Sequence, residues 1–479
     1  MHSARPALPT ILWALLTMAV VFVTYVPQLG APFELQDDHR IIEPLIHPPT
    51  AGPIALWLRE LGNDFTAVGR FRPVNQIFDV IGPLVLGPRP LLWHALSLLL
   101  AVTVSALLFL IGWRLFHSAA AAAMLALITM LAPDPGPTAA WYRLGPKEAW
   151  GMLFLAIALL LMLGRRWRTA FLFVVLCAYS KESFVLLIPA LFAVQVTLRR
   201  SWKGAIAYAL LLLLGLAAML YALRHAGAKS YGAASLARSP ASIAKVALRD
   251  VARAPLLAAF FVPALLALVL LARKRQWRAI ATAAVLFALW TGPQYALYAT
   301  RGGFWDHYWL PCVAAFAAIN AAGLALLERE APLLRHASLV IFTIWALNAI
   351  RIDAGAVRNF KVRATVQQAA VRLAAKHVRP QSTLLVIADR ETQFGEVATS
   401  FAEFARASGA PFRRALLHNA CCPARITPDV SVVVHLDQKE RAIAPGFERK
   451  AVSGTLRYLS LRKRAWDEAP FGFTMDVRP

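Results

Sequence analysis

The feature that most constrains this chain is a series of apolar runs, each about as long as a bilayer is thick. A membrane-spanning helix needs about 20 mainly apolar residues. The 479 residues are 59% hydrophobic and only 16% charged, which is unlike a soluble domain. We therefore expect an all-α polytopic membrane protein. Its eleven spans are predicted at residues 11–29, 90–112, 118–133, 147–163, 169–181, 183–198, 204–223, 255–272, 279–299, 308–327 and 334–350.

The basic residues indicate how these spans are oriented. The net charge is +24, but Lys and Arg lie in short clusters between apolar runs. No patch mixes basic and aromatic residues in the way that nucleic-acid interfaces do, so no nucleic-acid partner is expected. Cytoplasmic loops carry an excess of Lys and Arg. The clusters occupy alternate loops and comprise Arg114 with His117, Arg165-Arg166-Trp167-Arg168, Arg199-Arg200 with Lys203, and Arg273-Lys274-Arg275 with Arg278.

This orientation places the amino terminus in the cytoplasm and the carboxyl-terminal region on the external face. The short, weakly basic lead is followed by an apolar run without a clear cleavage site, so we expect a retained helix rather than a signal peptide. The predicted location is the plasma membrane, which is the inner membrane if the host is bacterial. The carboxyl-terminal region is then periplasmic.

The first external loop, at about residues 30–89, is too long to be a simple connector. Residues 55–61 and 73–86 have apolar residues at helical spacing, which predicts two short helices along the membrane surface. The loop opens with Asp37-Asp38, directly after the first span. Two adjacent carboxylates at this place are costly unless they face water, a cation or a polar substrate. The simplest alternative is a solvated acid pair.

The composition changes after residue 350. Helices are predicted at 360–378 and 394–407, and strands at 383–388, 413–417, 430–436 and 455–461. We therefore divide the chain into a transmembrane catalytic domain, 1–350, and a small external α/β domain, 351–479. Asp389 ends a predicted strand, a common ligand position, but no glycine-rich phosphate loop follows it. A structural or accessory role is expected for this domain.

The chain has four cysteines. Cys177 and Cys312 lie in or near apolar runs and are predicted to be packing residues. Cys421 and Cys422 are adjacent and are either a vicinal disulfide or two free thiols. Their spacing is not that of a metal site.

Two Lys-Glu pairs stand at the external ends of predicted spans, Lys147-Glu148 and Lys181-Glu182. Each begins a helix that runs back into the membrane. A helix amino terminus carries partial positive charge and unpaired N–H groups, so with a Lys beside it, it favours a phosphate. The Glu of each pair would neutralise a neighbouring cation. The alternative is an interfacial ion pair with a snorkelling Lys. Further cations expected on this face, able to make bidentate contacts, are Arg72, Arg143 and Arg301.

An anion site beside carboxylates at a membrane surface suits a lipid-linked phosphosugar. The cations would stabilise the lipid phosphate as the leaving group. An Asp would accept the proton of an acceptor hydroxyl, or bind a divalent cation that helps to do so. Adjacent residues of an extended loop point in opposite directions. We therefore expect one of Asp37 and Asp38 to be the base and the other to position it, with a slight preference for Asp37.

Several short motifs resemble the GT-C superfamily of membrane glycosyltransferases, which use polyprenyl-phosphate sugars, and particularly the bacterial relatives of protein O-mannosyltransferases. The matching stretches are 33–40, Phe71-Arg72-Pro73-Val74 with 93–97, 145–148, 180–183 and 307–311. The resemblance covers roughly residues 10–350. It implies an inverting transfer with an Asp of the first external loop as catalytic acid or base. It also implies a donor-phosphate contact from His307, with Glu148, Glu182 and Tyr308 in support.

The chain departs from the family pattern at three points. His307 stands where the family often has Arg, and Lys147 stands where Arg is common. No tetratricopeptide repeats follow the spans, and the small α/β domain occupies their place. The first two departures bear on individual phosphate contacts, not on the class.

The function expected from the sequence is transfer of a sugar from a polyprenyl-phosphate donor to a protein, lipid or polysaccharide hydroxyl. An O-antigen ligase or polymerase would use the same substrate on the same external face of the membrane. The cations of the 224–254 loop are compatible with this alternative. A transporter or flippase of lipid-linked glycans would show repeats and mid-membrane polar residues, and we find no convincing repeat. The fourth hypothesis is a non-catalytic scaffold that carries the terminal domain.

Overall fold

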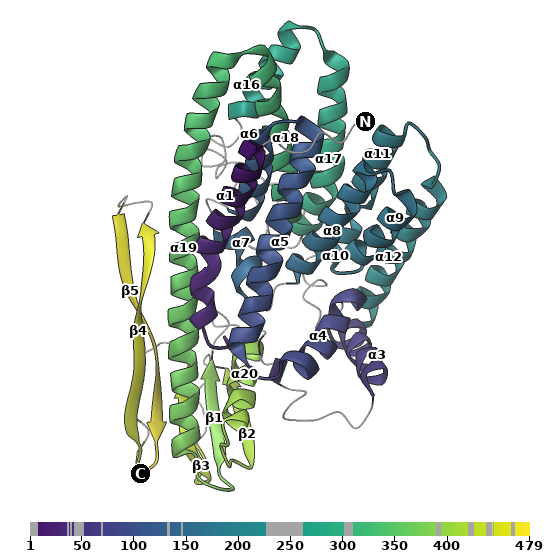
Figure 1. Cartoon of the computed structure of the whole chain (residues 1–479). Coiled ribbons are helices and arrows are strands. Elements are labelled where there is room, and N and C mark those ends of the chain that lie inside the picture. Colours follow the sequence, from purple (N-terminus) through teal and green to yellow (C-terminus); the bar gives the residue numbers. More distant parts are fainter. Residues whose placement is uncertain are drawn as a thin grey trace.

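The structure is a computed structural model. It describes residues 8–35, 38, 41–42, 52–68, 70–131, 135–144, 147–226, 262–300, 310–388, 394–419, 426–436, 443, 445–460 and 465–479. Helices stand side by side in a bundle, and a small sheet lies at one end of it beside the longest helix (Figure 1). The all-helical membrane part and the small carboxyl-terminal α/β part are both confirmed.

Each of the predicted spans overlaps a helix of the described residues. Among the described residues, seven helical stretches are long and apolar enough to cross a membrane. They are α1 (Leu8–Tyr25) with η1 (Val26–Gly30), α5 (Pro90–Phe116), α10 (Glu182–Val185) with α11 (Ile188–Arg199), α12 (Ala205–Ala226), α17 (Trp277–Thr300), α18 (Leu310–Glu330) and α19 (Pro332–His377). The other four predicted spans are the shorter apolar helices α6 (Ala119–Met130), α8 (Glu148–Leu163), α9 (Trp167–Ala178) and α16 (Val262–Arg273).

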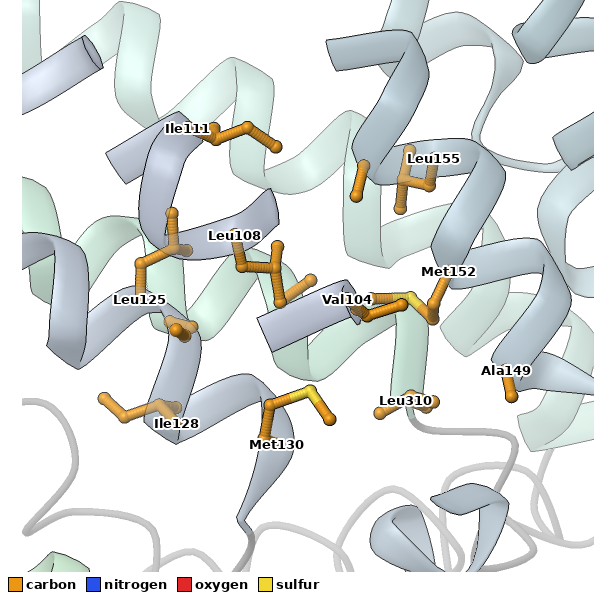
Figure 2. Packing of buried hydrophobic residues seen from close by; sticks show 14 of the residues in the cluster. Val104, Leu108, Ile111, Leu125, Ile128, Met130, Ala149, Met152, Leu155 and Leu310 are labelled. Atoms are coloured by element: carbon orange, nitrogen blue, oxygen red, sulfur yellow. The ribbon is translucent and has the colours of Figure 1, made fainter. Parts of the chain in front are cut away.

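Small residues let the central helices approach closely. The Ser118 hydroxyl caps α6 by accepting from the amide of Ala121 at 3.0 Å. A Cβ on Gly112 of α5 would lie 2.7 Å from the Cα of Ala122, so only glycine fits this contact. Figure 2 shows the apolar side chains that fill the space around these helices, contributed by α5 (Val104, Leu108, Ile111), α6 (Leu125, Ile128, Met130), α8 (Ala149, Met152, Leu155) and α18 (Leu310).

The loops separate to the two ends of the bundle. Lys274, in the turn between α16 and α17, pairs with Glu330 at the end of α18. Arg329 donates to the carbonyl of Phe116 at the end of α5, at 3.2 Å. These basic turns therefore lie together. The helices of the first long loop and the sheet lie at the opposite end (Figure 1). Which end faces the cytoplasm stays a prediction.

The first long loop contains both predicted surface helices. They are α3 (Pro53–Asn63) and α4 (Pro73–Leu86), separated by the single π-turn η2 (Asp64–Val68). Each helix starts at a proline, whose fixed φ suits the first helical position. A further short helix, α7 (Pro135–Tyr142), lies in the next loop at this end.

Helix α19 is 46 residues long and unites two elements that the sequence predicts as separate. The predicted span 334–350 and the predicted helix 360–378 are one continuous helix, which runs through the expected domain boundary at residue 350. The linking residues contain Gly355 but no proline, and a single glycine costs only about 1 kcal/mol in a helix. Asp353 and Val357 within this stretch are fully buried against the bundle, so tertiary packing keeps the helix intact.

The carboxyl-terminal domain is a five-stranded sheet in the order β2-β1-β3-β5-β4. The parallel strands β1 (Thr383–Ala388), β2 (Arg414–Asn419) and β3 (Val430–His435) confirm three predictions, and so does helix α20 (Phe394–Ala407). Strand β4 (Glu448–Ser460) begins earlier than predicted. Strand β5 (Ala465–Val477) is not predicted at all, because Pro470 and Gly472 are typical of turns. It forms because it pairs along its whole length with β4.

The core of this domain includes part of the first long loop. Phe33, Leu35, Ile41 and Ile42 are buried in one cluster with residues of α19, α20 and the sheet. The rings of Phe33 and Phe404 lie 6.1 Å apart. The domain that the sequence marks as accessory is therefore packed directly on the segment that carries Asp38.

Candidate active site

A cavity of about 90 Å³ lies at the end of the bundle that faces the carboxyl-terminal domain. Side chains from the first loop, α4, α5, α8 and the segment after α7 line it. Its polar lining is Asp38, Asp79, Ser97, Arg143 and Lys147, and its aromatic lining is Phe78, Trp93 and Trp150. Three residues predicted as site residues, Asp38, Arg143 and Lys147, are thus brought to one cavity by elements far apart in the sequence.

Asp38 is held in place by backbone contacts. Its side chain accepts a hydrogen bond from the amide of Glu34 at 2.7 Å, and its residue is only 2% exposed. The loop residues before Asp38 are bound to α19. The amide of Leu35 donates to Gln367 at 3.0 Å, and Gln368 donates to the carbonyl of Phe33 at 3.0 Å. Asp38 is therefore fixed relative to α19 and to the carboxyl-terminal domain.

Arg143 follows α7 and is oriented by Glu34. Its Nε donates to Oε2 of Glu34 at 3.0 Å, and Arg363 of α19 lies 3.9 Å from the other oxygen. Helix α7 is itself bound to α19, since the Thr138 hydroxyl donates to the buried carboxylate of Asp353 at 2.7 Å. One carboxylate, Glu34, thus lies between two guanidinium groups and orients Arg143 beside the cavity.

Lys147 precedes the first turn of α8 and pairs with Asp79 of α4. The other oxygen of Asp79, Oδ2, has no hydrogen-bond partner among the described residues. Asp79 was not among the predicted site residues. The signal that identifies it is its isolation, because it is the one charged residue of α4.

Three contacts position α4, two of them to the turn after α9 and one to the start of α8. The side chain of Asn75 donates to the carbonyl of Ser180 at 2.6 Å, and the amide of Val74 donates to the carbonyl of Tyr179 at 3.1 Å. The rings of Phe78 and Trp150 stack at 3.8 Å with an interplanar angle of 6°. Asp79, one residue after Phe78, is therefore placed against Lys147.

Two other predicted cations, Arg72 and Lys181, are buried and paired with carboxylates. Lys181, with a side chain 4% exposed, pairs with Glu148, which is fully buried, so the Glu of one predicted pair neutralises the Lys of the other. Arg72 makes two hydrogen bonds to Asp64, at 2.8 and 3.1 Å. Burial lowers the pKa of Arg72, but the attraction of Asp64 outweighs this and raises the pKa above its usual value. Contacts from Arg72 and Lys181 to a donor phosphate stay predictions.

Several predicted residues lie outside the described residues. These are Asp37, Arg301, His307, Tyr308, Asp389, Cys421, Cys422 and most of the 224–254 loop. The choice between Asp37 and Asp38 therefore stays open. Cys177 and Cys312 are buried and unbridged, as expected of packing residues. Glu182 is 7% exposed, and its negative charge contributes to the raised pKa of Arg72.

A divalent cation stays a proposal. Within the described ranges no three His, Cys, Asp or Glu residues are grouped so as to hold a metal ion. Of the two predicted ligands, Asp38 lines the cavity and Asp37 is not described.

Fold and cavity together define a polytopic membrane protein with a polar site at one end of its helix bundle. No family model matches the sequence, and no curated protein matches it. One similar solved structure is the Archaeoglobus fulgidus oligosaccharyltransferase tethered with an acceptor peptide containing the NVT sequon. The identity is 12% and the TM-score 0.45, over 88% of this chain and 69% of that chain. A likeness at this level carries no argument about the site.

Proposed function

We propose that this chain is a membrane glycosyltransferase that moves a sugar from a polyprenyl-phosphate donor to an acceptor hydroxyl of a protein, lipid or polysaccharide. The observation that carries the proposal is the cavity in which the carboxylates of Asp38 and Asp79 meet the cations of Arg143 and Lys147 at one end of an apolar bundle. The apolar bundle suits a lipid carrier. The cations suit the phosphate that joins the carrier to the sugar.

The proposed reaction is an inverting displacement at the anomeric carbon. The acceptor oxygen forms a bond to that carbon, the bond from carbon to the phosphate oxygen breaks, and the acceptor proton passes to a carboxylate. Arg143 and Lys147 stabilise the negative charge that develops on the departing lipid phosphate. The aromatic rings of Phe78, Trp93 and Trp150 would pack on the apolar faces of the sugar.

Donor binding in this proposal changes the partner of Lys147. The phosphate replaces the carboxylate of Asp79 on the Lys147 ammonium, which leaves Asp79 without its counter-ion. The carboxylate of Asp79 can then accept the proton of the acceptor hydroxyl. Asp79 is therefore a further candidate base beside Asp37 and Asp38.

We propose that the cavity and the carboxyl-terminal domain face the outside of the plasma membrane. The support is that the basic turns lie together at the opposite end of the bundle. A reporter fused after Pro479 should be external, and one inserted after Arg275 cytoplasmic. The reverse result would place the site on the cytoplasmic face and contradict the donor orientation.

The function is tested by sugar transfer at matched protein levels. Membranes with and without the protein are first compared by lipid-linked glycan analysis, which identifies the donor and product. Transfer is then measured for Asp37→Asn, Asp38→Asn and the double variant, with the exposed Glu448→Gln as control. Loss of the base should lower the rate about 10²–10⁴-fold. Full activity of the double variant would exclude both residues. Movement of the lipid-linked glycan without transfer would indicate a flippase.

A further inference from the structure

A second hollow lies outside the proposed active site, between α19 and the β4–β5 hairpin. It has a volume of about 840 Å³ and is open to solvent. Its cations are Arg351, Arg358 and Lys361 of α19 and Arg457 of β4, and its one carboxylate is Glu468 of β5. We call it the basic groove. Nothing in the proposed glycosyl transfer uses it.

The groove has a defined construction. Arg351, Gly355 and Arg358 are spaced four and three residues apart and so lie on one face of α19. The hairpin is fixed opposite by Asn359, which accepts from the amide of Arg457 at 2.9 Å and also donates to the carbonyl of that residue. Ala354 has a small side chain and Gly355 has none, which leaves space between helix and hairpin.

The groove carries uncompensated positive charge. Arg457 is neutralised by Glu468, with Nε and Oε1 2.6 Å apart. Over the described ranges, no ion pair involves Arg358 or Lys361, and both are exposed. A cleft lined by one sign of charge concentrates ions of the opposite sign. The ligand that fits is therefore an anion.

The position of the groove identifies the anion. The apolar run of α19 ends at residue 350, and Arg351 is the next residue. At a rise of about 1.5 Å per residue, Arg358 and Lys361 lie roughly 10 and 15 Å further along the axis. The headgroup layer of a bilayer is about 5–7 Å thick on each side. Arg351 thus lies at headgroup depth. The long side chains of the next two cations leave the helix toward its amino terminus, which is its apolar end, and so can reach back toward the membrane surface.

We infer that the basic groove binds the phosphate headgroup of an anionic phospholipid and so docks the carboxyl-terminal domain on the membrane. Because this domain shares its core with the Asp38 segment, docking would hold the proposed active site at a fixed height above the bilayer. The inference concerns a different surface from the donor cavity and stands whether or not the chain transfers sugars.

The test compares two matched charge removals on one helix. The full chain is purified in neutral detergent, titrated with phosphatidylglycerol, and its retained lipid counted by native mass spectrometry. The groove variant is Arg358→Gln with Lys361→Gln. The control is Arg372→Gln with Lys376→Gln, two exposed cations further along α19. A cation near an anionic lipid surface contributes about fivefold to binding, so we expect a loss of about 25-fold in the groove variant. The control should bind like wild type.

Three further arms identify the ligand. Phosphatidylcholine with the same acyl chains should be retained weakly by wild type and equally weakly by the groove variant. Inorganic phosphate at 10-fold excess over lipid should not displace phosphatidylglycerol. Undecaprenyl phosphate should bind wild type and groove variant alike. A second variant, Thr455→Glu, places a carboxylate in the groove without removing a cation and should lose phosphatidylglycerol in the same way.

Equal loss in the groove and control variants would overturn the inference in favour of a general charge effect. Displacement by inorganic phosphate would show a free-anion site. Selective loss of undecaprenyl phosphate would assign the groove to the donor instead. The proposed function is separate from these outcomes, because sugar transfer in detergent should stay within about twofold of wild type in the groove variant.

Discussion

The Nε of Arg143 lies 3.0 Å from the carboxylate of Glu34, although the two residues are 109 positions apart. Glu34 also donates its backbone amide to Asp38 at 2.7 Å. One residue of the first loop therefore orients both an acid and a cation of the cavity. The proposed active site is assembled around this contact.

Replacement of Glu34 should impair the site more than the fold. In Glu34→Gln the side chain keeps an acceptor but loses its charge, so Arg143 and Arg363 repel each other with less compensation. We expect transfer to fall about 10-fold, largely through a higher KM for the donor, while expression stays normal. Steady-state kinetics in membranes measures this. An unchanged KM would separate Arg143 from donor binding.

The Lys147–Asp79 pair can be analysed by a double-mutant cycle. Lys147→Met should raise the donor KM, whereas Asp79→Asn should mainly lower kcat if Asp79 becomes the base once the phosphate binds Lys147. The exposed pair Lys274 and Glu330 at the other end of the bundle is the control, with Lys274→Met expected to leave both constants unchanged. Purely additive losses would mean that Lys147 and Asp79 act independently. That result would contradict the proposal that the donor phosphate replaces Asp79 on Lys147.

The buried pair Lys181–Glu148 should be required for stability. Breaking a buried ion pair by removing one partner costs about 3–5 kcal/mol, because the other charge is left uncompensated. Lys181→Met should therefore lower the melting temperature strongly, and Lys181→Met with Glu148→Met should restore much of it. Thermal unfolding in detergent checks this. If Lys181→Met instead keeps its stability and loses donor binding, the predicted phosphate contact is supported.

Gly82 should control the width of the cavity. A Cβ at this position would lie 2.3 Å from Cη2 of Trp93, which lines the cavity. Gly82→Ala should displace the indole and cost about 1–3 kcal/mol, despite the better helix propensity of alanine. Gly62→Ala in α3, where a Cβ meets nothing within 4 Å, is the matched control and should be neutral or stabilising. Melting temperatures and transfer rates of the two variants should differ accordingly.

Asp476 should make the carboxyl-terminal domain sensitive to acid. Burial raises the pKa of Asp476, but hydrogen bonds from Arg449 and His435 outweigh this and hold the pKa below its usual value. A depressed folded-state pKa contributes stability that is present above the unfolded pKa of about 4 and is lost as pH falls toward the folded value. Wild type should therefore lose stability below about pH 4. Asp476→Asn should be less stable at pH 7 and show a flatter pH profile in hydrogen exchange of β3 and β5.

Much of the architecture was predictable because the bilayer limits what an apolar run can become. Backbone groups in a membrane must be satisfied within the chain, so each run had to be a helix. Local patterns also predicted α3, α4, α20 and the strands β1 to β3. In the same way the position of Asp38 after the first span, and of Lys147 at a helix start, marked them as candidate site residues, and both line the cavity.

Contacts between distant segments were decided only by the tertiary structure. Asp79 became a candidate site residue because Asn75 and Val74 bind the turn after α9 and Phe78 packs on α8, and no local pattern encodes these contacts. Lys181 was enclosed because Glu148 of another span lies beside it. Strand β5 formed through its partner β4, against its own composition. Pairings of this kind depend on which surfaces meet, and a linear sequence specifies them only through the whole fold.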